Sequence, residues 1–465
     1  MPQEPFAFGG DSAAKSRISA LILGAGKGVR MNSRLPKVLH PIGNRPMVLY
    51  PLNAALAAGA GTCVVVVGPD MADVAEAVAP VPTAVQAEPR GTADAVKPAR
   101  SAIGRDADTV LILFGDTPLI CPQTLEAMIA RRHAGGHAVV VLGFRPTEPG
   151  GYGRLVQGSD GMLEAIVEAR DATAEQREIG LCNSGVMAVD GAILFDLVDA
   201  VHNDNAKGEF YLTDIVGIAR RHGRTCSFIE AGADELLGIN SREELAAAER
   251  IFQQRMRRAA MAGGATLTDP DSVWFSYDTV LGRDVTVGPQ VVFGQGVVVG
   301  DDVEIRGFCH IEGAALDRGT TVGPFARLRP GAELREGARV GNFVEVKNAV
   351  LKPGARANHL TYIGDAEVGA GANIGAGTIT CNYDGFRKAR TVIGDGAFIG
   401  SNSALVAPVT IGERAIVGAG STIDRDVEAD ALALTRAEHT AVPGAAEMIR
   451  RRKAAGARET QGGKK

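Results

Sequence analysis

Residues 281–311 read LGRDVTVGPQVVFGQGVVVGDDVEIRGFCHI, and an aliphatic residue or Phe stands at every sixth position of this stretch. A period of six fits neither an α-helix, whose apolar face recurs after about three or four residues, nor an ordinary strand, which alternates about every two. It is typical of a β-solenoid in which each hexapeptide supplies one short strand and one turn. The period covers three runs, with these apolar positions: Leu281, Val287, Phe293, Val299, Ile305, Ile311; Leu316, Val322, Leu328, Leu334, Val340, Val346; and Ile393, Ile399, Leu405, Ile411, Val417, Ile423.

The repeats predict a prism of stacked coils. Three hexapeptides make one triangular coil, so residues 281–428 give about eight coils, roughly 40 Å tall at ~4.8 Å per stacked strand. Such a stack is quasi-one-dimensional, and its flat faces suit self-association. The rhythm breaks at 358–365 and again between Ile374 and Ile393, which are nineteen residues apart, one more than three repeats. We expect an additional loop to leave the prism at the second break.

The chain before the repeats is predicted to be α/β. Continuous apolar runs that alternate with helix-like segments are typical of a mostly parallel sheet covered on both faces, and ligands of such sheets bind beyond the carboxyl ends of the strands. The runs are 18–23, 63–68, 83–88, 109–116, 138–144 and 186–190. A capping box at Ser241 and Glu244 starts a helix over 241–261. The expected domains are a disordered leader at 1–17, an α/β domain at 18–240, a linker helix at 241–264, a β-helix at 265–440 and a basic tail at 441–465.

The composition is that of a globular chain, with 45% hydrophobic and 22% charged residues among 465. The net charge of −5 argues against nucleic acid as the main partner. No uncharged apolar run reaches ~18 residues, so no membrane span is expected. The six Cys lack metal-ligand spacing and residues 1–17 lack the apolar core of a signal peptide, which predicts free thiols and a cytoplasmic protein. The tail at 451–465 is expected to be disordered.

The strand at 18–23 leads into a glycine-rich turn, Leu23-Gly24-Ala25-Gly26-Lys27-Gly28-Val29-Arg30-Met31. Glycines let backbone N–H groups approach phosphates, although this pattern is neither a Walker loop nor G-x-G-x-x-G, and a tight turn alone remains open. Asp116 ends the apolar run at 109–116, where a carboxylate that faces a cleft suits Mg²⁺. Taken singly, Asp116 could instead cap a helix, and Lys37 could be a solvated surface charge.

The pattern L-x-A-G-x-G-x-R-M followed by Leu35-Pro36-Lys37 resembles sugar-1-phosphate nucleotidyltransferases. With the hexapeptide half, residues 18–440 resemble the bacterial family of bifunctional N-acetylglucosamine-1-phosphate uridyltransferases and glucosamine-1-phosphate acetyltransferases. This resemblance implies a Rossmann-like nucleotidyltransferase domain, a left-handed parallel β-helix and the formation of UDP-N-acetylglucosamine for cell-wall synthesis. It extends through 151–154, 166–168, 183–185, 208–214 and 238–240.

In the first domain the resemblance implies Mg²⁺-dependent uridylyl transfer from UTP to N-acetylglucosamine 1-phosphate. Arg30 and Lys37 would neutralise the triphosphate, and Asp116 and Asn240 would hold the metal. Residues that would contact UTP or the UDP-sugar are Leu23, Gly24, Ala25, Gly26, Lys37, Gln86, Gly91, Thr92, Gly153, Glu168, Asn183 and Asn240. The chain departs from the family pattern at Gly24 (usually Ala), Val29 (usually Thr) and Phe114 (commonly Tyr).

In the second domain a lone His359 would more often be structural than catalytic, but the resemblance implies that it deprotonates the amine of glucosamine 1-phosphate, which then attacks the acetyl-CoA thioester. Arg329 and Lys347 would bind the sugar phosphate, with Lys388 from an adjoining subunit of a homotrimer. Tyr362 and Asn373 would contact the sugar. The residues implied to bind acetyl-CoA are Ala376, Asn382, Tyr383, Ser401, Ala419 and Arg436.

Two alternatives stay open at this point. One is a single-activity sugar-1-phosphate nucleotidyltransferase whose β-helix is regulatory or only forms the trimer. The other is a structural solenoid with an inactive first domain. The motif at 358–365 with the Asn382–Lys388 loop argues against the first alternative, and the intact turn at 24–30 with Lys37 and Asp116 argues against the second.

Overall fold

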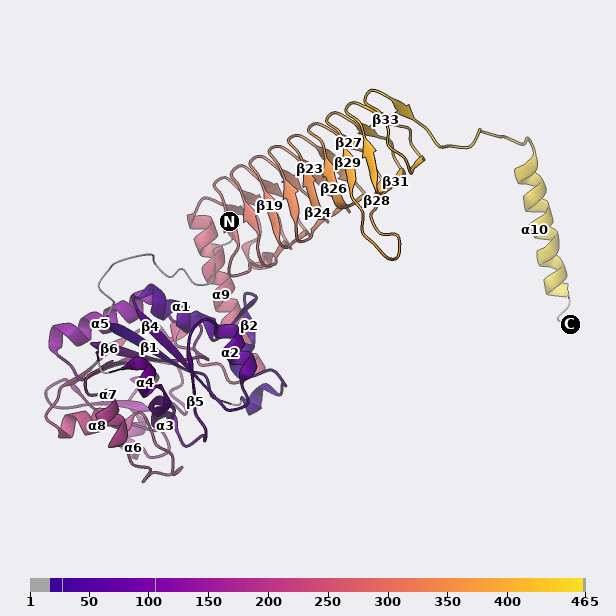
Figure 1. The fold of residues 1–465 in the computed structure, drawn as a ribbon. Coiled ribbons are helices and arrows are strands. Elements are labelled where there is room, and N and C mark those ends of the chain that lie inside the picture. Colours follow the sequence, from indigo (N-terminus) through magenta and orange to yellow (C-terminus); the bar gives the residue numbers. More distant parts are fainter. Residues whose placement is uncertain (1–16, 27, 105, 463–465) are drawn as a thin grey trace. The chain divides into compact units, whose positions relative to one another are not determined.

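The computed structural model describes residues 17–26, 28–104 and 106–462. The chain divides into two compact units, Met1–Val298 and Val299–Lys465 (Figure 1). This division falls within the hexapeptide repeats, and the domain boundaries expected from the sequence stay a prediction. Residues 1–16 of the expected leader lie outside the described residues. In the part of the chain that the structure describes, each helix is too short or too polar to cross a bilayer.

The first unit holds a sheet with the strand order β11-β7-β10-β6-β1-β4-β5. Strand β1 pairs in parallel with β4 and β6, and β10 runs antiparallel to β6 and β7. The strands are β1 Ile18–Leu23, β4 Thr62–Val67, β5 Thr83–Val85, β6 Thr109–Phe114, β7 Val139–Phe144, β10 Cys182–Asp190 and β11 Cys226–Glu230, with an antiparallel pair, β8 Arg154–Gln157 and β9 Leu163–Val167, beside β10. The mostly parallel α/β sheet expected from the sequence is therefore confirmed.

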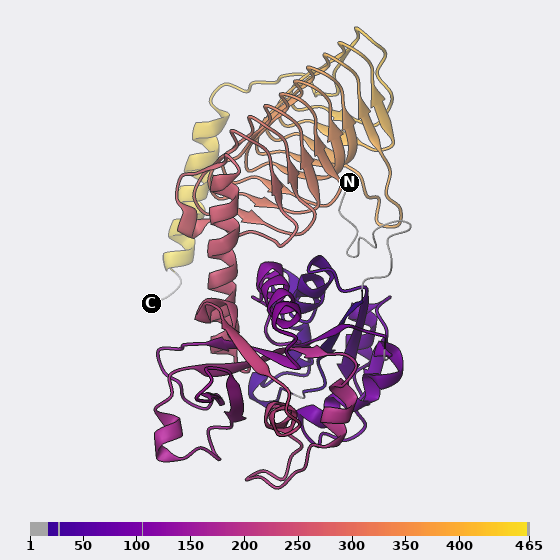
Figure 2. The ribbon, with the colours of Figure 1, turned by 90° about the vertical axis from the view of Figure 1, so that its left-hand side faces the viewer.

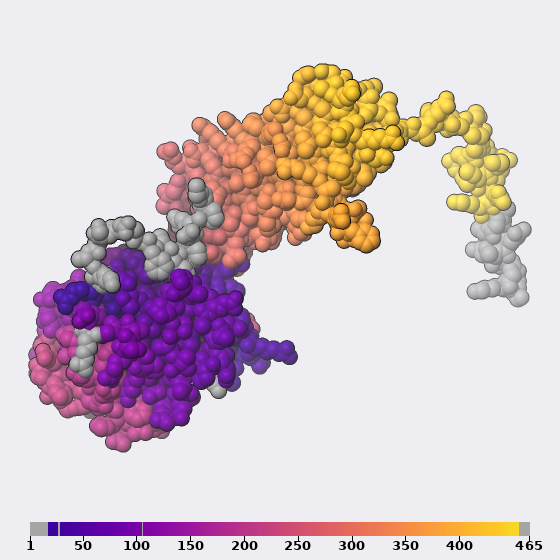
Figure 3. All heavy atoms as spheres, viewed as in Figure 1, coloured from indigo at the N-terminus to yellow at the C-terminus, as the bar shows by residue number. Residues whose placement is uncertain are grey.

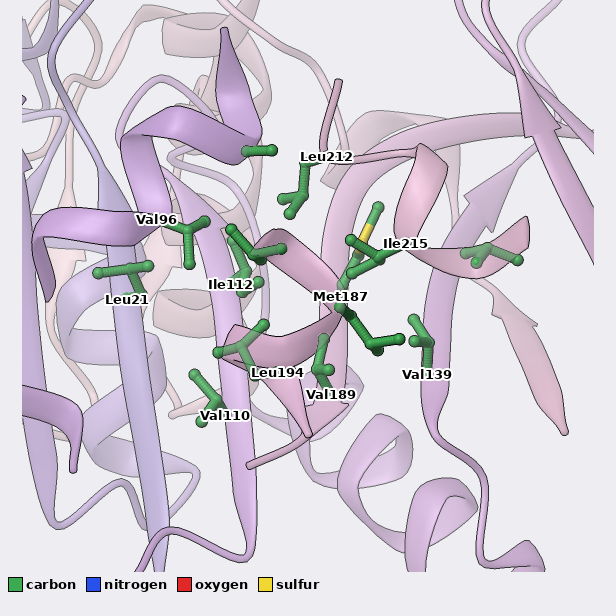
Figure 4. Packing of buried hydrophobic residues seen from close by; sticks show 14 of the residues in the cluster. Leu21, Val96, Val110, Ile112, Val139, Met187, Val189, Leu194, Leu212 and Ile215 are labelled. Atoms are coloured by element: carbon green, nitrogen blue, oxygen red, sulfur yellow. The ribbon is translucent and has the colours of Figure 1, made fainter. Parts of the chain in front are cut away.

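Helices cover both faces of this sheet. Leu21 of β1 belongs to a core shared with α3, α4, α7 and α8, whereas its neighbour Ile22 belongs to a core shared with α1, α2 and α5. Figure 4 shows the first of these cores, with Leu194 and Ile215 packed near Met187. The helices are α1 Leu49–Ala57, α2 Ala72–Val78, α3 Thr92–Val96, α4 Arg100–Ile103, α5 Pro122–Gly135, α6 Ala174–Arg177, α7 Leu194–Asp199 and α8 Asp214–Arg221, with 3-10 turns η1 Val29–Met31, η2 Lys37–Leu39, η3 Lys97–Ala99 and η4 Ala233–Glu235.

The predicted linker helix is α9, Arg242–Ala262, and its capping box forms as expected: Ser241 and Glu244 exchange side-chain and backbone hydrogen bonds. It packs against the hairpin of β2 (Pro41–Ile42) and β3 (Arg45–Pro46). At the tip of this hairpin Gly43 has φ +50°, and a Cβ there would lie 2.2 Å from the Phe252 ring of α9. Glycine is thus what lets helix and hairpin approach. The first unit ends with β12 Thr266–Leu267, η5 Pro270–Ser272, β13 Val280–Leu281, β14 Thr286–Val287, β15 Val292–Phe293 and most of β16 Val298–Val299.

In the second unit each coil lies in parallel register on the next (Figure 2). Ile305 pairs with Val322, 17 residues on, and Val322 pairs with Val340, 18 residues on. The paired aliphatic side chains are almost fully buried, and the hexapeptide β-helix is confirmed. Its strands are β17 Glu304–Ile305, β18 His310–Ile311, β19 Ala314–Leu316, β20 Thr321–Val322, β21 Arg327–Leu328, β22 Ala332–Leu334, β23 Arg339–Asn342, β24 Glu345–Leu351, β25 Arg356–His359, β26 Tyr362–Val368, β27 Asn373–Ile374, β28 Ile379–Cys381, β29 Thr391–Ile393, β30 Phe398–Ile399, β31 Ala404–Val406, β32 Val409–Ile411, β33 Ile416–Val417, β34 Thr422–Ile423 and β35 Leu432–Ala433.

One corner of the prism carries a column of apolar side chains, Phe308, Phe325, Phe343 and Leu360, which we call the Phe column. Each of these residues has a positive φ, between 49° and 63°. Neighbouring phenylalanine rings stack at 4.8 and 5.2 Å between centroids. All four side chains are exposed. Bulky residues seldom adopt this backbone conformation, so the corner combines local strain with exposed apolar surface.

The expected loop leaves the prism between β28 and β29, at residues 382–390 (Figures 1 and 3). The expected disorder of the tail is wrong as far as Gly462, because helix α10 spans Ala445–Gly462. Its composition of Ala, Glu and Arg favours helix, and Glu447 pairs with Arg451 one turn later. Helix propensity therefore outweighs the basic, low-complexity character that predicted disorder.

Candidate active sites

A cavity of about 490 Å³ opens at the carboxyl ends of β1, β4 and β6. This is the edge at which ligands of parallel sheets bind. Predicted nucleotide and metal residues that line it are Leu23, Gly24, Ala25, Gly26, Lys37, Gln86, Gly91, Thr92 and Asp116. Arg30, Gly153, Glu168, Asn183 and Asn240 are not among its lining residues. The structure therefore gathers one part of the predicted set around a single hollow.

The glycine-rich turn is held against β4 and against Lys37. The Gly24 N–H donates to the Val66 carbonyl at 2.8 Å. Gly28 has φ +61°, and a Cβ there would lie 2.4 Å from the Cβ of Lys37. The glycine at 28 therefore lets the lysine backbone come close to the turn. Arg30 lies in η1 with its side chain exposed, and Lys27 lies outside the described residues.

Lys37, Asp116 and Asn240 meet although they are distant in sequence. The Lys37 side chain is buried, its ammonium forms an ion pair with the Asp116 carboxylate, and it donates to Oδ1 of Asn240 at 3.0 Å. The Ile239 N–H donates to the Asp116 carbonyl at 2.9 Å, which ties the two ligand-bearing segments together. A carboxylate oxygen and an amide oxygen thus converge on one positive charge.

The opposite side of the cavity is fixed by Gln86, Gly91 and Thr92. Nε2 of Gln86 donates to the Gly91 carbonyl and to Asp94, both at 3.2 Å. Gly91 has φ +129°, and a Cβ there would lie 2.4 Å from the Phe210 carbonyl oxygen. The Thr92 hydroxyl accepts from the Leu212 N–H at 2.9 Å. This wall therefore depends on the segment at 208–214.

The residues expected to hold the sugar form a neighbouring group. The Asn183 N–H donates to the Gly153 carbonyl at 2.8 Å. The Glu168 carboxylate accepts from the Thr213 hydroxyl at 3.2 Å. Burial raises the pKa of Glu168, and the Thr213 hydrogen bond offsets only part of that shift. A buried carboxylate with one hydroxyl partner is suited to accept further hydrogen bonds from a sugar.

His359 ends β25, in register with Asn342 on the coil below. Its Nδ1 lies 2.6 Å from Oδ1 of Asn342. An amide oxygen only accepts, so this contact places the imidazole proton on Nδ1 and leaves the Nε2 lone pair free to act as a base. His359 is exposed, in contrast to a structural histidine packed in a core. Asn342 received no role from the sequence, although its distance of one coil from His359 could have identified it.

The charged residues expected around His359 pair with one another. Nη1 of Arg329 donates to Glu345 at 2.9 Å, and Glu345 stands in register with Tyr362. Lys347 lies 4.0 Å from Asp365. These contacts bring two of the predicted phosphate-binding cations to the same few coils as His359.

Asp365 is a second residue without a predicted role. Burial alone would raise its pKa, but hydrogen bonds from Asn348 and Asn382 and the charges of Lys347 and Lys388 hold that pKa below its usual value. A cavity of about 300 Å³ lies beside it and is lined by Lys388 of the protruding loop. Asp365 therefore fixes this loop to the prism through Asn382.

The residues expected to bind acetyl-CoA lie in the later coils. Ala376 and Ser401 lie at one corner, where their carbonyls accept from the N–H groups of Asn402 and Gly420 at 2.7 and 2.8 Å. Tyr383 is exposed on the loop, with its hydroxyl donating to the Gly385 carbonyl at 2.6 Å. Asn373 lies on β27, Ala419 follows β33, and Arg436 follows β35 near Gly418.

Two family models match the chain. A MobA-like NTP transferase domain matches residues 20–181. The bacterial transferase hexapeptide model (six repeats) matches residues 278–313 and 390–425. These matches agree with the α/β sheet and with the parallel prism, and they fit the left-handed β-helix expected from the sequence.

Relatives match almost the whole chain. The bifunctional protein GlmU of Rhodospirillum rubrum is 64% identical over 94% of this chain and 98% of its own. Those of Paramagnetospirillum magneticum and Rhizorhabdus wittichii are 58% and 59% identical over 95% and 93% of this chain and over 98% and 96% of their own chains. The two matched regions fit a nucleotidyltransferase and an acetyltransferase and do not favour a single-activity enzyme. The chain therefore belongs to the family of bifunctional GlmU proteins.

Proposed function

We propose that the first unit transfers a uridylyl group from UTP to N-acetylglucosamine 1-phosphate, and that the second unit makes this acceptor from glucosamine 1-phosphate and acetyl-CoA. The observation that carries the proposal is the presence of two separate reactive groups in one chain. Lys37 and Asp116 line a cavity at the sheet edge. His359 is exposed on the prism with a free Nε2.

In uridylyl transfer a phosphate oxygen of the sugar attacks the α-phosphorus of UTP, and pyrophosphate leaves. The nucleophile is already an anion, so no general base is required, and catalysis rests on positioning and charge neutralisation. We assign charge neutralisation to Lys37 and Arg30. The backbone of the turn at 23–26, with Gln86 and Thr92, holds the nucleotide.

We assign the metal to Asp116 and Asn240 and its identity to Mg²⁺. The donor set fits, because one carboxylate and one amide oxygen already converge on a cation, the ammonium of Lys37. Magnesium commonly takes one or two oxygen ligands from the protein and the rest from phosphates and water. When bound, the ion neutralises phosphate charge and orients the reacting groups. Gly153, Glu168 and Asn183 contact the sugar.

In acetyl transfer we assign His359 as the general base. Its Nε2 removes a proton from the C2 amine of glucosamine 1-phosphate, and the amine then attacks the thioester and releases coenzyme A. Arg329, Lys347 and Lys388 bind the sugar phosphate. The sugar contacts Tyr362 and Asn373, and acetyl-CoA lies along Ala376, Asn382, Tyr383, Ser401, Ala419 and Arg436.

We also propose that the protein is a cytoplasmic homotrimer. The Phe column exposes contiguous apolar surface on the prism, and Phe386 at the tip of the loop is 93% exposed. Such surface usually marks a protein interface. Cys63, Cys182, Cys226 and Cys309 are free and buried, as suits a reducing compartment.

The proposal is tested with the purified protein, glucosamine 1-phosphate, acetyl-CoA, UTP and Mg²⁺. Free thiol and pyrophosphate should both appear, and omission of acetyl-CoA should suppress both. Addition of N-acetylglucosamine 1-phosphate should then restore pyrophosphate release alone. Pyrophosphate release from glucosamine 1-phosphate without acetyl-CoA would contradict the proposed order of reactions.

A further inference from the structure

The first turn of α9 reaches back to the segment that carries the two cations of the uridylyl site. Nε of Arg242 donates to the Met31 carbonyl at 3.1 Å. Nη1 of the same side chain lies 3.2 Å from Nδ1 of His40. One guanidinium therefore contacts two points of the chain that are nine residues apart in sequence and about 200 residues from Arg242 itself.

These two points are the ends of the segment that forms one side of the cavity. Met31 closes η1, which contains Arg30, and it is 1% exposed. The N–H of His40 donates to the carbonyl of Lys37 at 3.2 Å. Residues 33–38, which lie between the two points, line the cavity. Arg242 thus spans the base of a loop whose interior faces the nucleotide.

His40 is suited to accept from the guanidinium. Its side chain is buried, at 3% exposure. Burial lowers the pKa of this imidazole, the charge of Arg242 lowers it further, and the Leu35 backbone works in the opposite direction. A neutral imidazole offers one lone pair, and the contact with Arg242 uses the one on Nδ1. No partner is found for Nε2 in the described structure.

Asn240 extends the same link. It accepts from Lys37 through Oδ1, and its own N–H donates to Glu244 of α9. The start of the linker helix therefore contacts Lys37 from one side through Asn240 and supports its loop from the other through Arg242. None of the residues of α9 lines the cavity, so the helix acts on the site by holding its parts.

We propose that Arg242 is a positioning residue for uridylyl transfer, which clamps Met31 to His40 and so holds Lys37 at the reacting phosphates. This inference rests on the role proposed for Lys37. The consequence is that the linker helix contributes to the chemistry of the first unit through its first turn. Arg242 need not touch substrate for this effect.

The test compares Arg242→Met, Arg242→Lys and, as a matched control, Arg250→Gln, which replaces an exposed arginine further along α9. Pyrophosphate release is measured with N-acetylglucosamine 1-phosphate as acceptor. Arg242→Met should lower kcat by about 10- to 100-fold with a smaller change in KM, because misplacement of a reacting group acts mainly on turnover. Arg242→Lys should recover part of the loss, since one ammonium replaces only one arm of the fork. Arg250→Gln should match the wild type.

A double-mutant cycle with Lys37→Met separates positioning from general damage. If Arg242 acts through Lys37, Arg242→Met should change kcat less than about 2-fold in the Lys37→Met background. A full additional loss in that background, or wild-type kcat in Arg242→Met alone, would overturn the inference. Acetyl transfer, measured in each preparation, should stay at the wild-type rate and reports on the second unit.

Should Arg242→Met fail to fold, as judged by its melting temperature, the cycle is run with Arg242→Lys, and an additive effect again overturns the inference. A wild-type protein without pyrophosphate release would instead count against the proposed function. Activity in the wild type with no effect of Arg242 counts against the positioning role alone. The two failures are therefore distinguishable.

Discussion

At the scale of single residues, the uridylyl site depends on one absent side chain. Gly28 adopts a left-handed conformation, and a methyl group there would lie 2.4 Å from Cβ of Lys37. Gly28→Ala should therefore displace Lys37 and lower the rate of pyrophosphate release by about 10-fold or more, with a cost of about 1 kcal/mol in stability. Gly232→Ala is a matched control, because its Cβ would meet no atom within 4 Å. Equal pyrophosphate rates in the two variants would contradict this account.

The acetyl site depends on a residue that orients its base. Asn342→Ala removes the oxygen that holds the Nδ1 proton of His359. We expect acetyl transfer, measured as thiol release, to fall by about 10-fold or more, since hydrogen-bond partners of a catalytic histidine fix its tautomer and orientation. Asn342→Asp keeps an oxygen acceptor and should retain more activity. Unchanged thiol release in the alanine variant would remove Asn342 from the mechanism, and pyrophosphate release serves as the control.

Asp365 gives the second unit a defined response to acid. Its pKa is lowered in the folded protein, so its ionised form contributes stability above the unfolded value of about 3.8, and this contribution is lost as the pH falls through the folded pKa. Asp365→Asn should lessen the loss of stability below about pH 4. Thermal melts of both proteins between about pH 3 and pH 6 test this. Parallel melting curves over that range would show that Asp365 is not responsible.

At the scale of elements, the hexapeptide period predicted the strands because each apolar position fills the same interior column. The contact between Asn342 and His359 was not predictable in the same way. It depends on a coil of 17 residues at that level, whereas neighbouring coils have 18. Register between coils is a property of packing, and a period counted along the chain does not specify it. The tail shows the same limit, because composition alone did not reveal helix α10.

In the first unit, the glycine turn and the carboxyl-end cavity could be predicted because both are local to one strand and its loop. Arg242 could not, since its contact with Met31 joins residues 211 positions apart. The helix itself was visible from its capping box, but the direction in which its first turn points depends on how α9 packs on the β2–β3 hairpin. Sequence therefore located the element and left its contribution to the site unseen.

At the scale of the whole molecule, the proposed trimer predicts that two inactive variants can restore each other. His359→Ala and Lys388→Ala lie on different subunits of one proposed acetyl site. Co-expression should therefore yield mixed trimers with measurable thiol release, because some sites receive His359 from one chain and Lys388 from another. His359→Ala with Lys347→Ala is the control and should stay inactive, since both residues come from the same subunit. Equal activity in the two mixtures would exclude a shared site.

The regular pairing of coils in the second unit also bears on how such a chain changes length. Because Ile305 and Val322 occupy equivalent positions one coil apart, excision of one complete coil would join strands that are already compatible, whereas loss of a single residue would turn every later aliphatic side chain outward. Gene duplication or deletion in whole-coil steps is thus a tolerated route of evolution for this prism. The same property makes it a scaffold that protein engineers can shorten or extend by defined units.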